Sequence, residues 1–285
     1  MLTKASNLKT SVNPVQLYRA KYLLRKFTVL QVPILSDNYA HVLVDNKARC
    51  ILAVDPADPV NVLKSVYSKY EKSFAFTSVL LTHKHSDHTA GNKYFYNHFS
   101  KLDIIGSKYE ICPYATKTVG DGDVLQFGEA TLRVLHVPGH TKGHLAFFVT
   151  TPSSSNPPIL FSGDTLFVGG CGKIFEGTAK DMYYSLKILT NLPPETLVYC
   201  GHEYTLSNLR FALTVEPNNE KLKSKLKWTI QQLNNQRSTV PSTIGEELEY
   251  NPFLRVEEEE IKVSTGKNSP IEVLGELREM KNNFK

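Results

Sequence analysis

The sequence predicts a layered domain of the α/β or α+β class, followed by a small helical domain. As far as about residue 203, apolar and β-branched runs alternate with segments of helical period. After Tyr204 the period is helical throughout, and the composition is rich in Lys, Glu, Leu and Gln. With 285 residues, 41% hydrophobic and 21% charged, the chain is long enough for one large domain with a small companion.

The first part of the chain contains runs that are typical of strands, each followed by turn residues. In chain order the predicted strands are 27–35, 40–46, 49–55, 74–81, 102–106, a hairpin within 122–137 that turns at Phe127-Gly128, 144–150, 158–164 and 196–201. Three helices are predicted among them. The first begins after an Asp58 N-cap with Pro59 in its first turn and ends near Tyr70. The others span 88–99 and about 179–191.

The last 80 or so residues predict helices only. The helical stretches are 205–217, 219–236 and 271–284. We expect Trp228, the only tryptophan, to anchor this region by packing, and the acidic run 257–260 to be a solvated surface. The chain contains no internal repeat.

Composition excludes several classes of protein. No apolar run approaches the roughly 20 residues that a membrane-spanning helix needs, so no membrane insertion is expected. The four cysteines are scattered, without a C-x-x-C pair, which indicates reduced thiols in an intracellular compartment. The net charge of +5 comes from the first 26 residues, because residues 27–285 carry 27 basic and 28 acidic side chains. A near-neutral body does not predict a nucleic-acid partner.

Residues 1–26 have the composition of a mitochondrial transit peptide. They contain six basic residues, several Ser and Thr, no acidic residue and an end rich in Leu and Tyr. A disordered basic tail or a nucleic-acid-binding arm are the alternatives. A secretory signal is not indicated, because no apolar core of 7–15 residues follows the first charges. The prediction is therefore location in the mitochondrial matrix.

Residues 82–92, THKHSDHTAGN, place three imidazoles and a carboxylate directly after a predicted buried strand: His83, His85, Asp87 and His88. Buried imidazoles and carboxylates each need a polar partner, and a metal ion can be the partner of all of them. His83 and His85 point to the same side if the strand continues that far, since side chains alternate along a strand. We interpret the cluster as metal ligands.

Further residues of the ligand type follow other predicted strands. His140 follows a Pro-Gly turn in HVPGHTKGH, Asp164 ends the strand in LFSGDT, and His202 ends the strand in VYCGHEY. Zinc prefers about four ligands, and a catalytic zinc keeps one position for water. Seven candidate ligands therefore predict two metal ions that share a carboxylate. His136 and His144 are not needed for this set, and we expect them to support it or to be structural.

The motifs THKHSDHTAGN, PGHTKGH, FSGDTLF and CGHEYT, in this order, resemble the H-x-H-x-D-H signature set of the metallo-β-lactamase superfamily. The stretch GDTLFVGGCGKIFEG and the helical tail narrow the resemblance to the glyoxalase II (hydroxyacylglutathione hydrolase) family, across nearly the whole chain after residue 26. The resemblance implies an αββα sandwich in residues 27–204, with metals at one edge of its two sheets. It implies a helical substrate-binding domain in residues 205–285.

The resemblance also implies a division of the ligands between two divalent metal ions: His83, His85 and His140 for the first, Asp87, His88 and His202 for the second, and Asp164 as the bridge. Zinc is the first expectation, although His/Asp sets also suit iron and manganese. The implied nucleophile is a metal-bridging hydroxide held by Asp164 and the histidine ligands, with no separate protein nucleophile. The implied reaction hydrolyses S-(2-hydroxyacyl)glutathione, chiefly S-D-lactoylglutathione, to glutathione and D-lactate, the second step of methylglyoxal detoxification.

Five positions match places where the family contacts glutathione: Lys173, Phe175, Tyr204, Arg278 and Lys281. Glutathione carries two carboxylates and one ammonium, so the cations Lys173, Arg278 and Lys281 suit it and would orient its thioester. Arg278 and Lys281 are three residues apart and therefore share one face of a helix. Phe175 stands where some members have a Tyr that hydrogen-bonds the peptide, and a phenylalanine can pack there without donating.

Other functions have weaker support in the sequence. A glutathione-persulfide dioxygenase of the same superfamily would use one iron held by two His and one Asp, and it would leave several of the seven ligands unexplained. A nuclease on this fold would need a basic face. A Cys171 nucleophile would need a nearby base, and the histidines are better explained as ligands. His41 and His98 are expected to be an ordinary core and an ordinary surface histidine. We expect a monomer.

Overall fold

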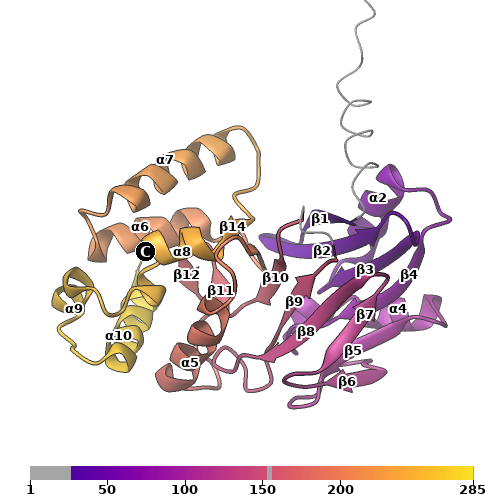
Figure 1. The fold of residues 1–285 in the computed structure, drawn as a ribbon, viewed down its shortest axis with the longest axis horizontal. Coiled ribbons are helices and arrows are strands. Elements are labelled where there is room, and N and C mark those ends of the chain that lie inside the picture. The colour runs from indigo at the N-terminus through magenta and orange to yellow at the C-terminus, as the bar shows by residue number, and fades with distance from the viewer. Residues whose placement is uncertain (1–26, 153–155, 285) are drawn as a thin grey trace, which may run out of the picture.

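The computed structural model describes residues 27–152 and 156–284, and the predicted transit peptide, residues 1–26, lies outside the described residues. Two six-stranded sheets face each other, and helices cover the outer face of each (Figure 1). A set of C-terminal helices lies beside the second sheet (Figure 1). The predicted mixed α/β class is confirmed. Within the described residues, no helix has the length and the apolar character that crossing a membrane requires.

The first sheet has the strand order β1-β2-β3-β4-β5-β6. Its strands are β1 (Phe27–Ile34), β2 (Asn38–Asp45), β3 (Cys50–Val54), β4 (Ala75–Leu80), β5 (Asp103–Ser107) and β6 (Lys117–Val119). β1 to β3 form an antiparallel meander, and β3 to β6 run parallel. Helices α2 (Pro59–Lys69) and α4 (Asn92–His98) belong to this half, and the side chain of Asp58 caps α2 as predicted.

The second sheet has the order β14-β13-β10-β9-β8-β7. Its strands are β7 (Val124–Phe127), β8 (Ala130–His136), β9 (Leu145–Thr150), β10 (Ile159–Gly163), β13 (Leu197–Cys200) and β14 (Ser242–Thr243). Strands β10 and β13 are parallel neighbours, and the other described pairs of this sheet are antiparallel. A separate two-stranded ribbon consists of β11 (Leu166–Phe167) and β12 (Gly170–Cys171). The short strands β6, β11, β12 and β14 were not predicted from the sequence.

Within residues 156–284, seven helical segments lie on the outer side of the second sheet: α5 (Ala179–Thr190), α6 (Thr205–Val215), α7 (Glu220–Asn234), α8 (Ile244–Tyr250), the 3-10 turn η1 (Pro252–Leu254), α9 (Glu259–Thr265) and α10 (Pro270–Asn283). The three helices predicted for the tail correspond to α6, α7 and α10. Helices α8 and α9 were missed because each has only seven residues, too few for a periodic pattern.

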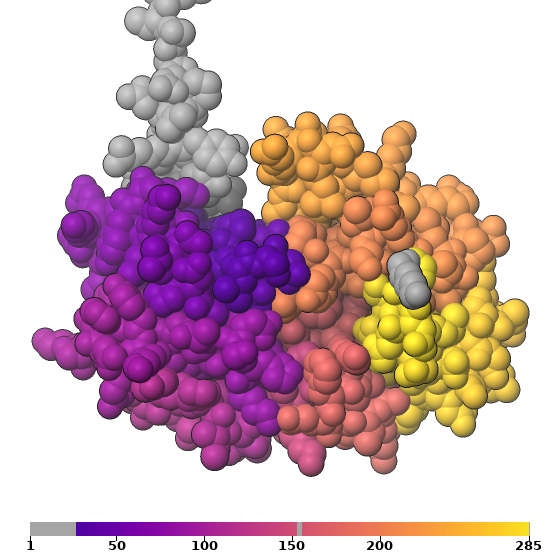
Figure 2. All heavy atoms as spheres, turned by 180° about the vertical axis from the view of Figure 1, so that it is seen from behind, coloured from indigo at the N-terminus to yellow at the C-terminus, as the bar shows by residue number. Residues whose placement is uncertain are grey.

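Three layers of buried apolar side chains hold the four structural layers together. Leu43 and Leu80 of the first sheet pack with Phe147 and Phe161 of the second. Another layer lies between the first sheet and helices α2 and α4. The last joins the outer face of the second sheet to α5, α6, α9 and α10. The orange and yellow atoms of the C-terminal helices accordingly lie directly against the red atoms that precede them in the chain (Figure 2).

The prediction of one continuous helix over residues 88–99 is wrong. The chain forms a single turn, α3 (Ser86–Thr89), and begins α4 only at Asn92. The break falls at Ala90-Gly91, where a Cβ atom on Gly91 would collide with the carbonyl oxygen of Pro56. The close approach of these two backbones requires glycine and holds α3 against the end of β3.

Candidate metal centre and substrate pocket

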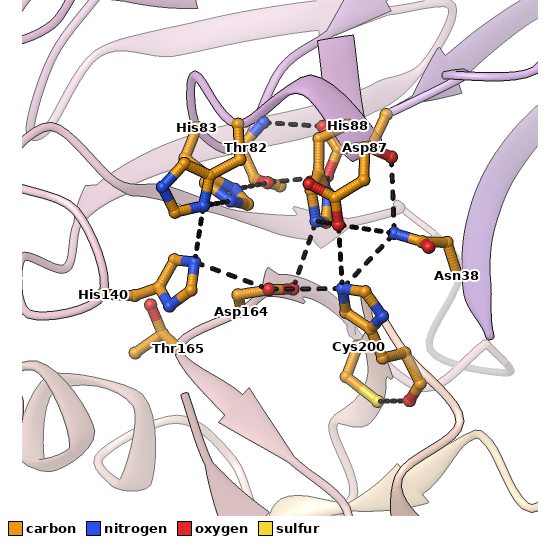
Figure 3. A network of polar contacts seen from close by, with 12 residues as sticks. Asn38, Thr82, His83, Asp87, His88, His140, Asp164, Thr165 and Cys200 are labelled. Carbon is orange, nitrogen blue, oxygen red and sulfur yellow. Dashed lines mark hydrogen bonds and ion pairs between the residues drawn. The ribbon is translucent and has the colours of Figure 1, made fainter. Parts of the chain in front are cut away.

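Four loops that follow strands bring the seven predicted ligands together. His83 and His85 follow β4, Asp87 and His88 lie on α3, and His140, Asp164 and His202 follow β8, β10 and β13. The first sheet thus contributes one loop and the second sheet three. Figure 3 shows His83 and His140 on one side of Asp164, and Asp87 and His88 on the other.

The first group of donors contains three imidazole nitrogens. His85 Nδ1 lies 3.0 Å from His83 Nε2 and 3.0 Å from His140 Nε2. Each hydrogen bond needs one N–H donor and one lone pair. His85 Nδ1 has a single position for a hydrogen, so as a donor it can satisfy only one of its two neighbours. One metal ion bound to all three lone pairs resolves this conflict.

The second group contains Asp87, His88 and His202. Asp87 Oδ2 lies 3.5 Å from His88 Nε2 and 3.5 Å from His202 Nε2. Asp164 lies between the groups. Its Oδ2 is 3.5 Å from His140 Nε2 and 3.3 Å from His202 Nε2, and its Oδ1 is 3.5 Å from His88 Nε2. The carboxylate of Asp164 therefore touches ligands of both groups.

Outer hydrogen bonds fix which nitrogen of each imidazole faces the site. His88 Nδ1 donates to Asp55 Oδ2 at 2.9 Å, and His202 Nδ1 donates to Asp37 Oδ1 at 2.7 Å. His140 Nδ1 donates to the carbonyl oxygen of Lys173 at 2.9 Å. His83 Nδ1 lies 3.0 Å from the Thr82 hydroxyl, which itself donates to Asp55. Each Nε2 therefore faces the site and is the nitrogen that a metal ion can bind.

The carboxylates Asp37 and Asp55 were not predicted from the sequence as part of the site. Asp55 follows β3 just as His83 follows β4, so its place at a strand end was the available signal. Asn38, the first residue of β2, is a further addition. Its side-chain amide donates to Asp87 Oδ2 at 3.0 Å.

His144 lies behind the site. The backbone N–H of Asp164 donates to His144 Nε2 at 3.0 Å, so His144 fixes the backbone of the central carboxylate. Burial lowers the pKa of His144 well below its usual value, which keeps the ring neutral and able to accept. This contact agrees with the supporting role predicted for His144.

The protonation of the two donor groups differs. Burial lowers the pKa of His83 and of His140, so both rings are neutral. Burial alone would also lower the pKa of His202, but hydrogen bonds with Asp164 and Asp87 raise it to about 10. The bond to His202 holds the pKa of Asp87 well below its usual range. Without a metal, the second group therefore binds a proton between its carboxylates and imidazoles, and a cation can replace that proton.

The residues present fit two metal ions. Among the described residues, His88 Nε2 and Asp164 Oδ1 are buried polar atoms without a hydrogen-bond partner. Leaving such atoms unpaired is costly, and both point into the donor groups. Three imidazoles in one group, and a carboxylate with two imidazoles in the other, are donor sets that suit first-row divalent metals. The two groups, joined by Asp164, indicate a dinuclear metal centre.

A pocket with a volume of about 540 Å³ opens over this centre. Its inner end is lined by His85, Asp87, His140, Asp164 and His202. Its outer end is lined by all five predicted substrate-binding residues: Lys173, Phe175, Tyr204, Arg278 and Lys281. Phe167, Ser207, Asn208 and Asn282 also line it and were not predicted from the sequence.

The basic residues of the pocket come from two parts of the chain. Arg278 Nη1 donates to the carbonyl oxygen of Cys171 at 2.7 Å, and Lys281 Nζ donates to the Ser207 hydroxyl at 2.7 Å. Both residues lie on α10, next to each other along one face. Lys173 Nζ lies 5.4 Å from the ring centre of Phe175. No one of these three cations forms an ion pair with an acidic side chain among the described residues, so each can meet an acidic ligand.

Two aromatic residues flank the metal ligands. The ring of Tyr204 stacks on His202 at 4.6 Å between centres. Burial, together with the carboxylates of Asp37, Asp164 and Asp87, raises the pKa of Tyr204, so its hydroxyl keeps its proton. The ring of Phe175 lies 5.2 Å from His140 and is 57% exposed at the mouth of the pocket. Phe175 offers an apolar surface there and no donor.

Several other candidates lie outside the metal centre. His41 is buried, contacts the Cys200 carbonyl oxygen and has a pKa that burial lowers to about 4. His136 stacks on Tyr109 at 4.0 Å, away from the ligands. Cys171 lines the pocket, but burial raises the pKa of its thiol to about 11. A protonated thiol is a poor nucleophile, which is against a role for Cys171 in catalysis.

The two facing sheets with metal-ligand loops at one edge define a metallo-β-lactamase fold. The model of the metallo-beta-lactamase superfamily matches residues 42–202. A solved structure titled as ETHE1 from Myxococcus xanthus is similar, with a TM-score of 0.62, 25% sequence identity, and 88% of this chain and 89% of that chain covered. These likenesses confirm the predicted αββα sandwich.

The helical region narrows this class. Residues 203–284 match the model described as the hydroxyacylglutathione hydrolase C-terminus. The chain is 44% identical to a protein of Arabidopsis thaliana named hydroxyacylglutathione hydrolase cytoplasmic, over 90% of this chain and 99% of that protein. It is 41% identical to the hydroxyacylglutathione hydrolase of Crocosphaera subtropica, over the same shares of the two chains. The chain belongs to the hydroxyacylglutathione hydrolase family, and it is a hydrolase.

Proposed function

We propose that the enzyme hydrolyses the thioester of S-(2-hydroxyacyl)glutathione, chiefly S-D-lactoylglutathione, to glutathione and D-lactate. The observation that carries this proposal is the arrangement of metal-donor groups and cations along the pocket. Two metal-donor groups lie at its inner end, and Lys173, Arg278 and Lys281 lie at its outer end. A peptide with two carboxylates and an acyl group on its central thiol fits both ends at once. The family relatives support the same reaction.

The side chains of the pocket bind and orient the substrate. Lys173, Arg278 and Lys281 would receive the two carboxylates of glutathione, which places the thioester carbonyl over the seven metal ligands. Fixing the substrate in this way converts binding energy into orientation of the reacting groups. Tyr204, whose hydroxyl stays protonated, stacks on His202 beside the bound substrate. The leaving group is a thiolate, so no protein acid is required to protonate it.

Two divalent ions are the proposed cofactors, with zinc first and iron or manganese compatible with the donors. Bound there, such ions supply a Lewis acid and lower the pKa of a bound water toward 7. His83, His85 and His140 would hold the first, and Asp87, His88 and His202 the second, with Asp164 shared. A mononuclear iron dioxygenase is less well supported, because it gives the second donor group no role.

The direct test is loss of thioester absorbance when the purified enzyme is mixed with S-D-lactoylglutathione, with metal analysis of the same sample. We expect saturable hydrolysis and close to two metals per chain. A fully active sample with less than one metal per chain would overturn the dinuclear proposal. Oxygen consumption with glutathione persulfide, in place of thioester hydrolysis, would favour the dioxygenase.

Lys281 should give the reaction a pH dependence. Burial, with the neighbouring guanidinium of Arg278, lowers the pKa of Lys281 to about 8. Below that pH the side chain is an ammonium that attracts a carboxylate, and above it the charge is lost. We expect kcat/KM to fall about tenfold between pH 7 and pH 9, since this ratio reports groups of the free enzyme.

Lys281→Arg keeps a charge throughout this range and is the matched variant. Its kcat/KM should stay level over the same interval, after the spontaneous hydrolysis of the thioester is subtracted. An equal fall in the wild type and in Lys281→Arg would assign the pH dependence to a different group.

We also propose that residues 1–26 direct the chain to the mitochondrial matrix, and that the enzyme acts as a monomer. The six basic residues and the absence of acidic ones support the first proposal. For the second, one chain supplies both the metal-donor groups and the cations of the pocket, so no residue of another copy is needed to complete the site. Residues 1–26 fused to a fluorescent protein should be imported, and should stay in the cytosol when the six basic residues are changed to glutamine. Light scattering gives the mass in solution.

A further inference from the structure

Glu247 is a fully buried acidic residue that the proposed reaction does not use. It lies on α8, in the helical region, and its side chain has no exposed surface. Its Oε2 accepts from the backbone N–H of Gly169 at 2.8 Å and from the Asn251 amide at 2.9 Å, and its Oε1 accepts from the Tyr250 hydroxyl at 2.8 Å. Burying a carboxylate is costly, so a position that retains one needs an explanation.

The residue that Glu247 binds, Gly169, is the turn of the β11–β12 ribbon, with a left-handed φ of 67°. Neighbouring polar groups of the helical region hold the same ribbon. The Asn251 amide donates to the carbonyl oxygens of Phe167 at 3.3 Å and Gly170 at 3.0 Å. The Asn208 amide donates to the carbonyl oxygen of Val168 at 3.1 Å. The backbone groups at the tip of the ribbon are therefore paired with side chains of α6, α8 and the residue after α8.

The ribbon in turn shapes the outer end of the pocket. Phe167 lines the pocket and lies edge-on to the ring of Tyr204, at 5.3 Å between centres. The carbonyl oxygen of Cys171 accepts from Arg278, which fixes that guanidinium on the pocket wall. Lys173 follows two residues later. The positions of three of the five predicted glutathione-binding residues, Lys173, Tyr204 and Arg278, therefore depend on where the ribbon lies.

We propose that Glu247, together with Asn251, is a positioning residue that holds the β11–β12 ribbon and through it the glutathione-binding end of the pocket. The inference rests on the proposed function and deepens it. Neither residue lines the pocket or contacts a metal ligand, so neither is a catalytic residue. The metal ligands have separate support from Asp37, Asp55 and Thr82. Loss of the ribbon's support should weaken substrate binding more than the chemical step.

The test compares Glu247→Met with Glu247→Gln. Methionine keeps about the same volume and removes both acceptors, so KM for S-D-lactoylglutathione should rise about tenfold, with kcat within about twofold and metal content unchanged. Glutamine keeps one oxygen for Gly169 and can donate its amide to the Tyr250 hydroxyl, so it should restore most of the affinity. Calorimetry with glutathione, the product, should show the same loss and recovery without turnover.

Glu216→Met is the matched control. Glu216 is also a buried glutamate of the helical region, bound to Arg255 at 2.8 Å and without contact to the ribbon. It should lower the melting temperature and leave KM unchanged. A KM for Glu247→Met no higher than that of Glu216→Met would overturn the proposal.

A second variant covers the case in which Glu247→Met does not fold. Asn251→Ser keeps an oxygen for the cap on the Phe253 N–H and removes the amide that reaches Phe167 and Gly170. It should raise KM at unchanged kcat, and an unchanged KM would contradict the inference. A wild-type enzyme that does not hydrolyse the thioester would instead contradict the proposed function, which separates the two failures.

Discussion

Replacing Asp164 with asparagine is expected to reduce kcat/KM by more than about 10³-fold and to remove bound metal from the same sample. Asp164 is buried and contacts His88, His140 and His202, which belong to both donor groups. Asparagine has the same shape but no negative charge, and its amide hydrogens would face imidazole nitrogens and metal ions. The substitution therefore removes the group that the two metal positions share while it leaves the packing almost intact.

The measurement is metal content per chain together with the rate of S-D-lactoylglutathione hydrolysis. Asp103→Asn provides the control, because Asp103 is a half-buried aspartate that begins β5 and pairs, among residues 27–152 and 156–284, with Lys117 at 2.8 Å. It should keep both the metal and the rate. Retention of two metals and of the wild-type rate by Asp164→Asn would contradict the bridging role and, with it, the division of ligands between two ions.

The clustering of the seven candidate ligands could be predicted from the sequence because of where these residues stand along the chain. Each of the four ligand loops follows an apolar run that forms a strand. The ends of such strands meet at one edge of the sheets. His83, His85 and His88 also lie within six residues, too close together for a purely structural set. The residue types and their positions at strand ends both indicated one metal site. The structure gathers the seven residues into two neighbouring donor groups joined by Asp164.

The supporting residues could not be predicted in the same way. Asp37 reaches His202 across 165 positions of sequence, and Glu247 reaches Gly169 across 78. A single aspartate or glutamate in a turn or a helix carries no periodic signal, and only the fold shows which distant group it meets. The break between α3 and α4 has the same origin, since Gly91 is required by the backbone of Pro56 and not by local propensity. Long-range contacts decided these features.

Arg278→Met is expected to reduce kcat/KM about 10- to 100-fold, mainly through a higher KM. A hydrogen bond to a charged group contributes about 1.5–3 kcal/mol, and each 1.4 kcal/mol corresponds to a factor of ten. Methionine retains much of the contact of the side chain with Phe253, whose ring centre lies 5.3 Å from the guanidinium. The change therefore removes the charge and the hydrogen bonds of Arg278 and leaves most of its packing in place.

Arg278 also donates to the Cys171 carbonyl oxygen, so a loss of activity could come from a displaced ribbon as well as from a lost substrate contact. A second substrate separates the two causes. The lactoyl thioester of N-acetylcysteamine has the same reacting group but no carboxylate. If Arg278 binds a carboxylate, Arg278→Met and the wild type should hydrolyse this truncated thioester at similar rates, although both should be slow.

Arg210→Met gives the matched control, because Arg210 is an exposed arginine of α6 that does not line the pocket. It should leave both substrates unaffected. An equal loss on both substrates for Arg278→Met would assign the residue to the ribbon alone. A loss confined to the glutathione thioester would show that Arg278, on the C-terminal helix α10, selects the substrate by a carboxylate, and that the metal-ligand loops act on the lactoyl thioester without it.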